Sequence, residues 1–207
     1  MKKKIAFVHN AMWEMYNFRG ELLQELKAKG YEITVICPPD EKNAHYFTDL
    51  GIKLLTVPMS RKGTNIKEDL QLVKNLFKVY KKEKFDLVFH YTIKPNIYGT
   101  LAAKLAGIKS IAITTGLGYV FLHNNITSLI AKFMYKFSLA FANEVWFLND
   151  DDMNIFLDKD LITERQAFKL PSEGINTKRF VPKEKNRKDS KTVFLMIARV
   201  LYDKGFN

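Results

Sequence analysis

The sequence has 207 residues, with 33 lysines and arginines against 22 aspartates and glutamates, so its formal net charge is +11. Because 47% of the residues are apolar, the chain can bury a hydrophobic core, which excludes a disordered basic tail. The single cysteine, Cys37, excludes an internal disulfide framework and is expected to be a small buried residue in a protein of a reducing compartment.

Short apolar runs alternate with longer segments of helical periodicity, which predicts repeated strand and helix units around a parallel sheet. In the first half we expect strands over 5–8, 31–37 and 53–57 and helices over 18–29, 41–50 and 66–82. The helix over 18–29 places three leucines on one face, namely Leu22, Leu23 and Leu26. The helix over 66–82 has a basic outer face and an apolar face formed by Leu70, Val73, Leu76, Phe77 and Tyr80.

The second half continues the same alternation. We expect strands over 85–90, 109–115 and 144–148, a helix over 96–106 that ends at Gly107, and an edge strand over 168–170. The fold class is therefore α/β, with a Rossmann-like, doubly wound parallel sheet.

Apolar residues also repeat at helical spacing between 126 and 141, with Lys132 and Lys136 on the other side. The apolar row consists of Ile126, Leu129, Ile130, Phe133, Met134, Phe137 and Phe141. Our main interpretation is a helix that packs this row on the sheet, because core packing is the usual role of such a row. The alternative is a helix that lies on a membrane surface.

Composition divides the chain into three parts. Residues 1–170 form the Rossmann-like domain, and residues 171–191 are a polar, charged linker that contains Pro182. Residues 192–207 are expected to be the first strand and turn of a second, truncated α/β domain. One strand cannot bury both of its faces, so we expect more chain to follow or a neighbouring sheet to be borrowed.

Several common functional motifs are missing. There is no Gly-x-x-x-x-Gly-Lys phosphate loop and no Gly-x-Ser-x-Gly elbow, and Phe121 stands where a dinucleotide fingerprint needs its third glycine. The histidines at 9, 45, 90 and 123 are too scattered to indicate a metal site. The apolar run at 5–8 is too short for an export signal, and no run reaches the roughly 18 residues of a spanning helix. We expect a cytoplasmic protein that uses no metal.

The acidic run Asp150–Asp152 has two interpretations. An Asp-x-Asp pair after a strand can hold a divalent cation, because hard cations prefer carboxylate oxygens. The run also lies where a helix begins, and acidic residues in a first turn complement the helix dipole. We favour the helix start over the metal site.

A series of segments in chain order resembles glycosyltransferase family 4, of the GT-B fold. The segments are Asn17-Phe18-Arg19, residues 94–99, residues 115–119, residues 174–182, and Arg199 with Lys204-Gly205. The resemblance extends over essentially the whole chain. Within the family, the chain is most similar to bacterial enzymes that extend lipid-linked sugars in protein glycosylation and in capsule or other surface polysaccharide assembly.

The resemblance implies the N-terminal, acceptor-binding domain of a retaining glycosyltransferase that uses a nucleotide sugar, expected to be UDP-linked. It implies that Arg199 and Lys204 hold the donor diphosphate, where two cations can stabilise a leaving phosphate without a metal. Gly174 begins the segment that marks the crossing between the two GT-B domains and is the expected hinge. The acidic residues that grip the donor would lie beyond residue 207, so we expect the 207-residue chain alone to transfer no sugar.

The family places the acceptor at the carboxyl ends of the parallel strands, where open α/β sheets bind ligands. The candidates there are His9, Asn10, Asn17, Arg19, His90, Lys94, Asn96, Thr115, Gly116, Gly118 and Tyr119. Arg19 is expected near a helix start, where a cation and free amides could receive an anionic group. Alternatively, Asn10 and Asn17 only form turns, Gly116 and Gly118 only permit the backbone to bend, and Lys94 is an ordinary solvated lysine. The family often has a histidine where this chain has Thr115, which leaves the contacts to the donor sugar open.

The basic charge has alternative partners. The lysines between 74 and 84 could bind nucleic acid or only solvate a helix, and no nucleic-acid motif supports the first reading. The resemblance instead implies an anionic membrane surface at the inner face of the cell membrane and a lipid-linked or polysaccharide acceptor. A second hypothesis stays open, in which the chain is a non-catalytic α/β binding module or a partner subunit.

Overall fold

The computed structural model describes residues 2–60, 65–117, 121, 126–171, 173–182, 192 and 194–198. The chain forms two compact units, residues 1–173 and residues 174–207. All the helices and strands identified among the described residues belong to the first unit. The predictions for Gly118, Tyr119, Arg199 and Lys204 lie outside the described residues.

The first unit is built on one parallel sheet with the strand order β3-β2-β1-β4-β5-β6-β7. The strands are β1 Lys4–Val8, β2 Glu32–Cys37, β3 Lys53–Thr56, β4 Leu87–Tyr91, β5 Lys109–Thr114, β6 Glu144–Phe147 and β7 Ala167–Lys169. The order reverses between β1 and β4, and the carboxyl ends of the strands at such a reversal are where sheets of this kind bind ligands. The predicted α/β class and the expected edge strand are confirmed.

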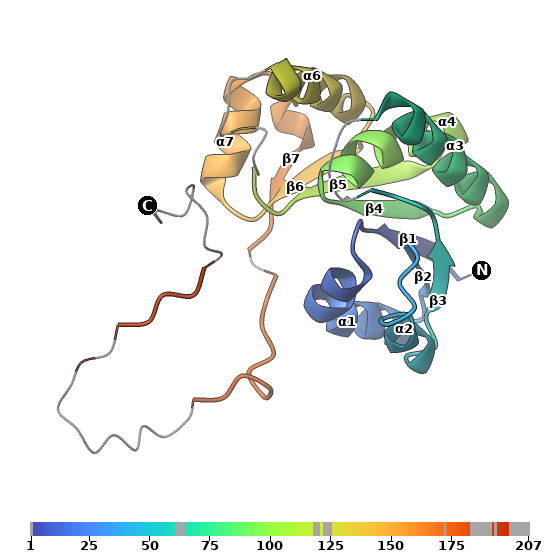
Figure 1. Ribbon diagram of the computed structural model, residues 1–207, viewed down its shortest axis with the longest axis vertical. Coiled ribbons are helices and arrows are strands. Elements are labelled where there is room, and N and C mark those ends of the chain that lie inside the picture. Colours follow the sequence, from blue (N-terminus) through green and yellow to red (C-terminus); the bar gives the residue numbers. More distant parts are fainter. Residues whose placement is uncertain are drawn as a thin grey trace. The chain divides into compact units, whose positions relative to one another are not determined.

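Helices cover both faces of the sheet. They are α1 Met12–Ala28, α2 His45–Asp49, α3 Ile66–Glu83, α4 Thr100–Ala106, α6 Ile126–Leu139 and α7 Asp150–Asp158. A π-helical turn, η1 Pro95–Gly99, leads into α4, and a short 3-10 turn, η2 Glu164–Gln166, precedes β7. Figure 1 shows α1 and α2 on one face, and α3, α4, α6 and α7 on the other.

Alternation along the strands builds the core on both faces. In β1, Phe7 points to the α1 side, while Ala6 and Val8 point to the α3 side. Phe7 stacks on Phe89 of the neighbouring strand, with ring centroids 4.9 Å apart. Cys37 is buried, as predicted, and burial raises the pKa of its thiol to about 12.

Helix α1 begins at Met12, six residues before the predicted start. The backbone nitrogen of Ala11 donates to Nδ1 of His9 at 2.9 Å, and Ala11 is extended, so the turn after β1 is short. Met12 and Met15 are buried and extend the core-facing side toward the N-terminus. Because the helix begins at Met12, Arg19 lies well inside it. The prediction that Arg19 is near a helix start is therefore wrong.

Two other predicted helices also differ in extent. Helix α2 begins at His45 because residues before it form a turn in which Asp40 accepts hydrogen bonds from the side chain and backbone of Asn43. The helix predicted over 96–106 is divided into η1 and α4. Gly99 ends η1 against the ring of His90, where an added Cβ would lie 2.5 Å from Cδ2, so this position needs glycine.

Helix α6 does not pack as the main interpretation predicted. Six of the seven residues of its apolar row are exposed, with Phe133 69% and Ile126 76% accessible, while the opposite side buries Tyr135, Ser138 and Leu139. Met134 alone of the row is partly buried against the core cluster. Core packing is therefore wrong for the other six residues, because Tyr135 and Leu139 of the other side supply the contacts with the core. Among the described residues, no helix combines the length and apolar character needed to cross a bilayer.

In the second unit, residues 194–198 belong to no strand, and Phe194 is 92% exposed. The expected start of a second α/β domain stays a prediction, since the structure describes only residues 192 and 194–198 of that segment. Strand pairing needs a neighbouring strand, and the described part of this unit contains none.

Candidate polar site at the carboxyl ends of the strands

A cavity of about 400 Å³ lies at the carboxyl ends of β3 and β4. Its wall is formed by the segment after β3, the first turns of α3, and Lys94, which follows β4. The polar side chains on this wall are Ser60, Lys67, Glu68, Asp69, Gln71, Asn75 and Lys94. Hydrogen-bond donors and acceptors are thus interspersed around one hollow.

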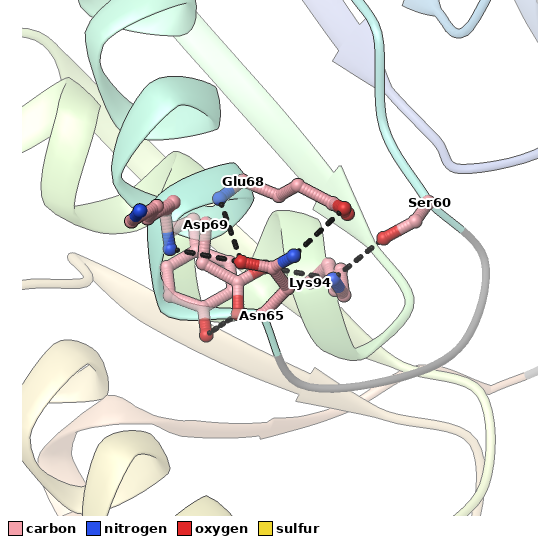
Figure 2. A network of polar contacts seen from close by, with 7 residues as sticks. Ser60, Asn65, Glu68, Asp69 and Lys94 are labelled. Atoms are coloured by element: carbon pink, nitrogen blue, oxygen red, sulfur yellow. Dashed lines mark hydrogen bonds and ion pairs between the residues drawn. The ribbon is translucent and has the colours of Figure 1, made fainter.

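The centre of this wall is a buried ion pair between Lys94 and Asp69 (Figure 2). Lys94 Nζ donates to Asp69 Oδ1 at 2.7 Å and to Ser60 Oγ at 2.8 Å. The hydroxyl of Tyr98 donates to the other oxygen, Asp69 Oδ2, at 2.8 Å. Each carboxylate oxygen of Asp69 therefore has one donor and keeps capacity to accept another.

The start of α3 fixes the position of Asp69. Asn65 is the N-cap, and its Oδ1 accepts from the backbone nitrogens of Lys67 and Glu68 at 3.1 and 3.4 Å. Asn65 Nδ2 also donates to Glu68 Oε1 at 2.9 Å. These contacts orient the first turn so that Asp69 points inward beside Lys94 (Figure 2).

Because Lys94 and Asp69 are charged and buried, the loss of either side chain should strongly destabilise the fold. Asp69 and Lys94 are both buried, and removing one partner of such a pair leaves an uncompensated buried charge at a cost of about 3–5 kcal/mol. Burial, and then the contact with the Asp69 carboxylate, raise the pKa of Tyr98 above its ordinary value. Tyr98 therefore stays a neutral donor. Lys94 is not a freely solvated lysine, since its charge is already matched.

Arg19 is also paired. Its Nη2 donates to the carboxylate of Glu173, its Nη1 donates to the carbonyl of Phe18 at 3.0 Å, and its guanidinium lies 4.8 Å from the ring centroid of Tyr91. Burial raises the pKa of Tyr91 to about 12, and the charge of Arg19 opposes this shift. Glu173 therefore matches the charge of the guanidinium in this structure, and the anion-binding role expected of Arg19 stays a prediction.

His90 lies inside β4 and is fully buried. Its Nε2 is 2.9 Å from the hydroxyl of Tyr80, and its Nδ1 is 3.3 Å from Oγ1 of Thr100. Burial lowers the pKa of His90 to about 3, so the imidazole is neutral near pH 7. The expectation that His90 lies in the cleft after the strand is corrected by this position. The His90 side chain lies between the sheet and the helices that cover it, where it contacts Tyr80 of α3 and Thr100 of α4.

The remaining candidate site residues differ in how deeply they are buried. Asn96 is buried in η1 and donates to the carbonyl of Ile113 at 3.0 Å, which ties η1 to the end of β5. Thr115 and Gly116 are exposed just after β5, and the φ of Gly116, 139°, favours glycine. Asn10 follows β1 and Asn17 lies within α1, both partly buried.

The proposed hinge residue, Gly174, is the first residue of the second unit and has a φ of 72°, in the left-handed region. Its role as a hinge stays a prediction. The structure thus places Lys94, Asn96, Thr115, Gly116 and Asn10 around the carboxyl ends of the strands.

Sequence reasoning missed Asp69, Tyr98 and Ser60. It assigned Leu70 to the buried face of α3, but Leu70 is 66% exposed and Asp69 is buried instead. Asp69 matches the spacing of the buried residues Leu72, Leu76 and Tyr80, and this was the available signal. A carboxylate at a core position of a helix indicates a buried cationic partner.

The acidic run at 150–152 begins a helix, as favoured. Asn149 Oδ1 accepts from the backbone nitrogen of Asp152 at 2.7 Å, and Asp150 pairs with Lys169 of β7 at 2.7 Å. Among the described residues, no group of three His, Cys, Asp or Glu side chains is arranged to hold a metal ion.

Comparison with known proteins agrees with this architecture. A curated relative from Campylobacter jejuni, N,N'-diacetylbacillosaminyl-diphospho-undecaprenol alpha-1,3-N-acetylgalactosaminyltransferase, is 32% identical over 98% of this chain and 57% of its own length. A second, the UDP-Gal:alpha-D-GlcNAc-diphosphoundecaprenol alpha-1,3-galactosyltransferase of Escherichia coli, is 25% identical over 82% of this chain and 46% of its own. The chain thus spans about half the length of these relatives.

The fold is also found in solved structures. Anabaena HepE in complex with UDP and glucose matches with a TM-score of 0.61 at 16% identity, over 85% of this chain and 46% of that protein. This likeness shows the fold. The family model named Glycosyl transferase 4-like matches residues 4–149, which is most of the chain, and confirms the resemblance noted in the sequence. The protein therefore belongs to the glycosyl transferase 4-like family.

Proposed function

We propose that this chain is the acceptor-binding half of a retaining glycosyltransferase. In this proposal the enzyme moves a sugar from a nucleotide sugar, UDP-linked, to a lipid-linked or polysaccharide acceptor in bacterial surface glycan synthesis. The names of both curated relatives support it, since each is a transferase that acts on a sugar joined to undecaprenol through a diphosphate.

The observation that carries the assignment of this half is the polar cavity around Asp69. Sugars offer many hydroxyl and amide groups, and a site that binds them needs donors and acceptors at fixed positions. Asp69 is held by Lys94 and Tyr98 and lines the hollow, so its carboxylate is preorganised to accept a hydrogen bond from a sugar hydroxyl.

In this proposal the acceptor cavity and the donor-binding cations have different chemical roles. The cavity orients the acceptor so that its nucleophilic hydroxyl faces the donor, which lowers the entropic part of the barrier. Charge that develops on the departing diphosphate is stabilised by the cations Arg199 and Lys204, without a metal ion. The buried Lys94 acts through Asp69 as a positioning residue, because its own charge is already paired.

The proposal includes the membrane. A lipid-linked acceptor is held at a bilayer, and a chain with a net charge of +11 is attracted to the anionic cytoplasmic leaflet. The protein would then act as a peripheral protein at the inner face of the cell membrane.

A binding experiment tests the acceptor assignment with the 207-residue chain itself. The probe is a short-chain polyprenyl diphosphate that carries N-acetylglucosamine, titrated calorimetrically against the same diphosphate without the sugar. We expect the sugar-bearing probe to bind more tightly. The double variant Asp69→Asn/Lys94→Met, which removes both buried charges together, should lose at least about tenfold of that affinity, or roughly 1.4 kcal/mol.

The matched control is Asp86→Asn. Asp86 also pairs with a lysine, Lys3, but it precedes β4 at the amino ends of the strands. Equal affinity of the wild-type chain for both probes, or an unchanged affinity in the folded double variant, would overturn the assignment. Thermal unfolding of each variant checks that the fold is intact.

A further inference from the structure

The outer side of α6 is more apolar than the side that faces the core. We use the name α6 outer face for the exposed row on this side. It consists of Ile126, Leu129, Ile130, Phe133 and Phe137, and Phe141 continues it after the end of the helix. Phe137 and Phe141 form an edge-to-face contact with ring centroids 5.5 Å apart, so the row is continuous there. Soluble proteins seldom expose such a set of large side chains together unless the surface has a partner.

The fold does not require this row. The inner side of α6 supplies Tyr135 and Leu139 to the core cluster shared with α7, and Ser138 Oγ donates to the carbonyl of Tyr135 at 3.2 Å. In Figure 1 α6 lies in the helix layer together with α3, α4 and α7, on one face of the sheet. Substitutions on the outer face should therefore leave the core unchanged.

Cations flank the α6 outer face. Lys136 is exposed on α6, and Lys104 of α4 places its Nζ 5.5 Å from the ring centroid of Phe141. Leu105, next to Lys104, is also exposed. An apolar surface bordered by lysines matches an anionic bilayer, in which acyl chains receive the apolar residues and headgroups receive the charges.

We propose that the α6 outer face inserts into the interfacial layer of an anionic membrane, with Lys104 and Lys136 at the headgroups. This inference rests on the proposed function, because a lipid-linked acceptor stays in that membrane. A second copy of the chain is a poorer occupant, since a symmetric contact would bring lysines of like charge together.

Insertion of the α6 outer face would also set the position of the candidate site relative to the membrane. Helix α6 packs against η1, and η1 begins one residue after Lys94. Ile97 of η1 and Tyr135 and Leu139 of α6 belong to the same buried core cluster, so the two elements touch through their side chains. The inserted face and the cavity around Asp69 therefore belong to one packed unit.

Vesicle sedimentation with the 207-residue chain tests the inference. The vesicles are phosphatidylcholine alone or a mixture with phosphatidylglycerol. We expect partitioning to the anionic mixture and a loss of at least about tenfold in the double variant Leu129→Ser/Phe133→Ser, because each buried CH₂ group contributes about 0.8 kcal/mol. The variant Lys104→Gln/Lys136→Gln should weaken binding to anionic vesicles alone.

The matched control is Phe18→Ser/Leu22→Ser. These two residues are exposed one turn apart on α1, on the opposite face of the sheet, and their loss should not change vesicle binding. Unchanged binding of the α6 variant, or an equal loss in the α1 variant, would overturn the inference. Self-association that the α6 variant abolishes, without any vesicle binding by the wild-type chain, would identify a second copy and overturn it as well.

A labelled residue gives an independent readout. Cys37 is the only cysteine and is buried, so Phe133→Cys can be labelled selectively with an environment-sensitive fluorophore. Its emission should shift to the blue with anionic vesicles, whereas the same label at Phe18→Cys should not respond. Binding of the short-chain probe separates the two ideas. If Leu129→Ser/Phe133→Ser loses vesicle binding and retains probe binding, both are supported, whereas a variant that retains both overturns this inference alone. If the wild-type chain binds anionic vesicles through α6 but does not prefer the sugar-bearing probe, the proposed function fails and the membrane contact stands.

Discussion

Arg19 of α1 forms an ion pair with Glu173, which lies 154 residues later in the chain. The guanidinium is held over Tyr91 at the end of β4, so a single side chain joins the first helix, the middle of the sheet and the segment after β7. Glu173 is the last residue of the first compact unit. This contact therefore fixes the point at which the chain leaves the α/β domain.

Loss of this contact should destabilise the domain. Arg19→Met removes a hydrogen-bonded ion pair from a mostly buried position, and we expect the free energy of unfolding to fall by about 2 kcal/mol. Urea denaturation provides the measurement. The control Arg165→Met replaces an exposed arginine and should change stability by less than about 0.5 kcal/mol. Equal stability of the two variants would show that the Glu173 contact is dispensable.

The pair of Lys94 and Asp69 should show strong energetic coupling. Lys94→Met leaves the buried carboxylate with the Tyr98 hydroxyl as its side-chain donor within the described part of the chain, so the free energy of unfolding should drop by about 3–5 kcal/mol. Adding Asp69→Asn removes the stranded charge and should restore stability to within about 1 kcal/mol of the wild-type chain. A double-mutant cycle in urea measures this coupling; simple additivity of the two changes would contradict it.

His90 should make stability depend on pH. Burial lowers its pKa from 6.5 to about 3 in the folded chain, so between these values the unfolded chain binds a proton that the folded chain does not. Stability should therefore fall as the pH decreases below about 6.5, by up to about 1.4 kcal/mol per pH unit.

The variant His90→Gln isolates this effect. Between about pH 6.5 and pH 5 the wild-type chain should lose roughly 2 kcal/mol more unfolding free energy than the variant. Denaturant titrations at both pH values give the comparison. Parallel loss of stability in both proteins would exclude His90 as the source.

The strands were predictable because each is a short apolar run between polar segments. Ile5–Val8 and the run that ends at Cys37 gave strands within a residue of those observed, and the alternating order of elements was sufficient for the parallel sheet. The start of α1 was not predictable in the same way, since the residues from Met12 to Asn17 mix polar and apolar types. Their helical form depends on burial of Met12 and Met15 against the sheet.

The site was predicted less completely than the fold. Position after a strand identified Lys94 and Asn96, because the carboxyl ends of parallel strands share one edge. Asp69 was not found, since its burial depends on tertiary contacts with Lys94 and Tyr98 that no local pattern encodes. Periodicity also could not predict that the α6 row points outward, because it defines the faces of a helix but not which face meets the core.

The two ends of the sheet are short, and this limits unwanted assembly. Strand β3 has four residues and β7 has three, and each carries a lysine in an ion pair, Lys53 with Glu83 and Lys169 with Asp150. Little unpaired backbone is available for another chain to join by β-strand addition. The domain should consequently resist edge-to-edge aggregation while leaving its helical faces free for association.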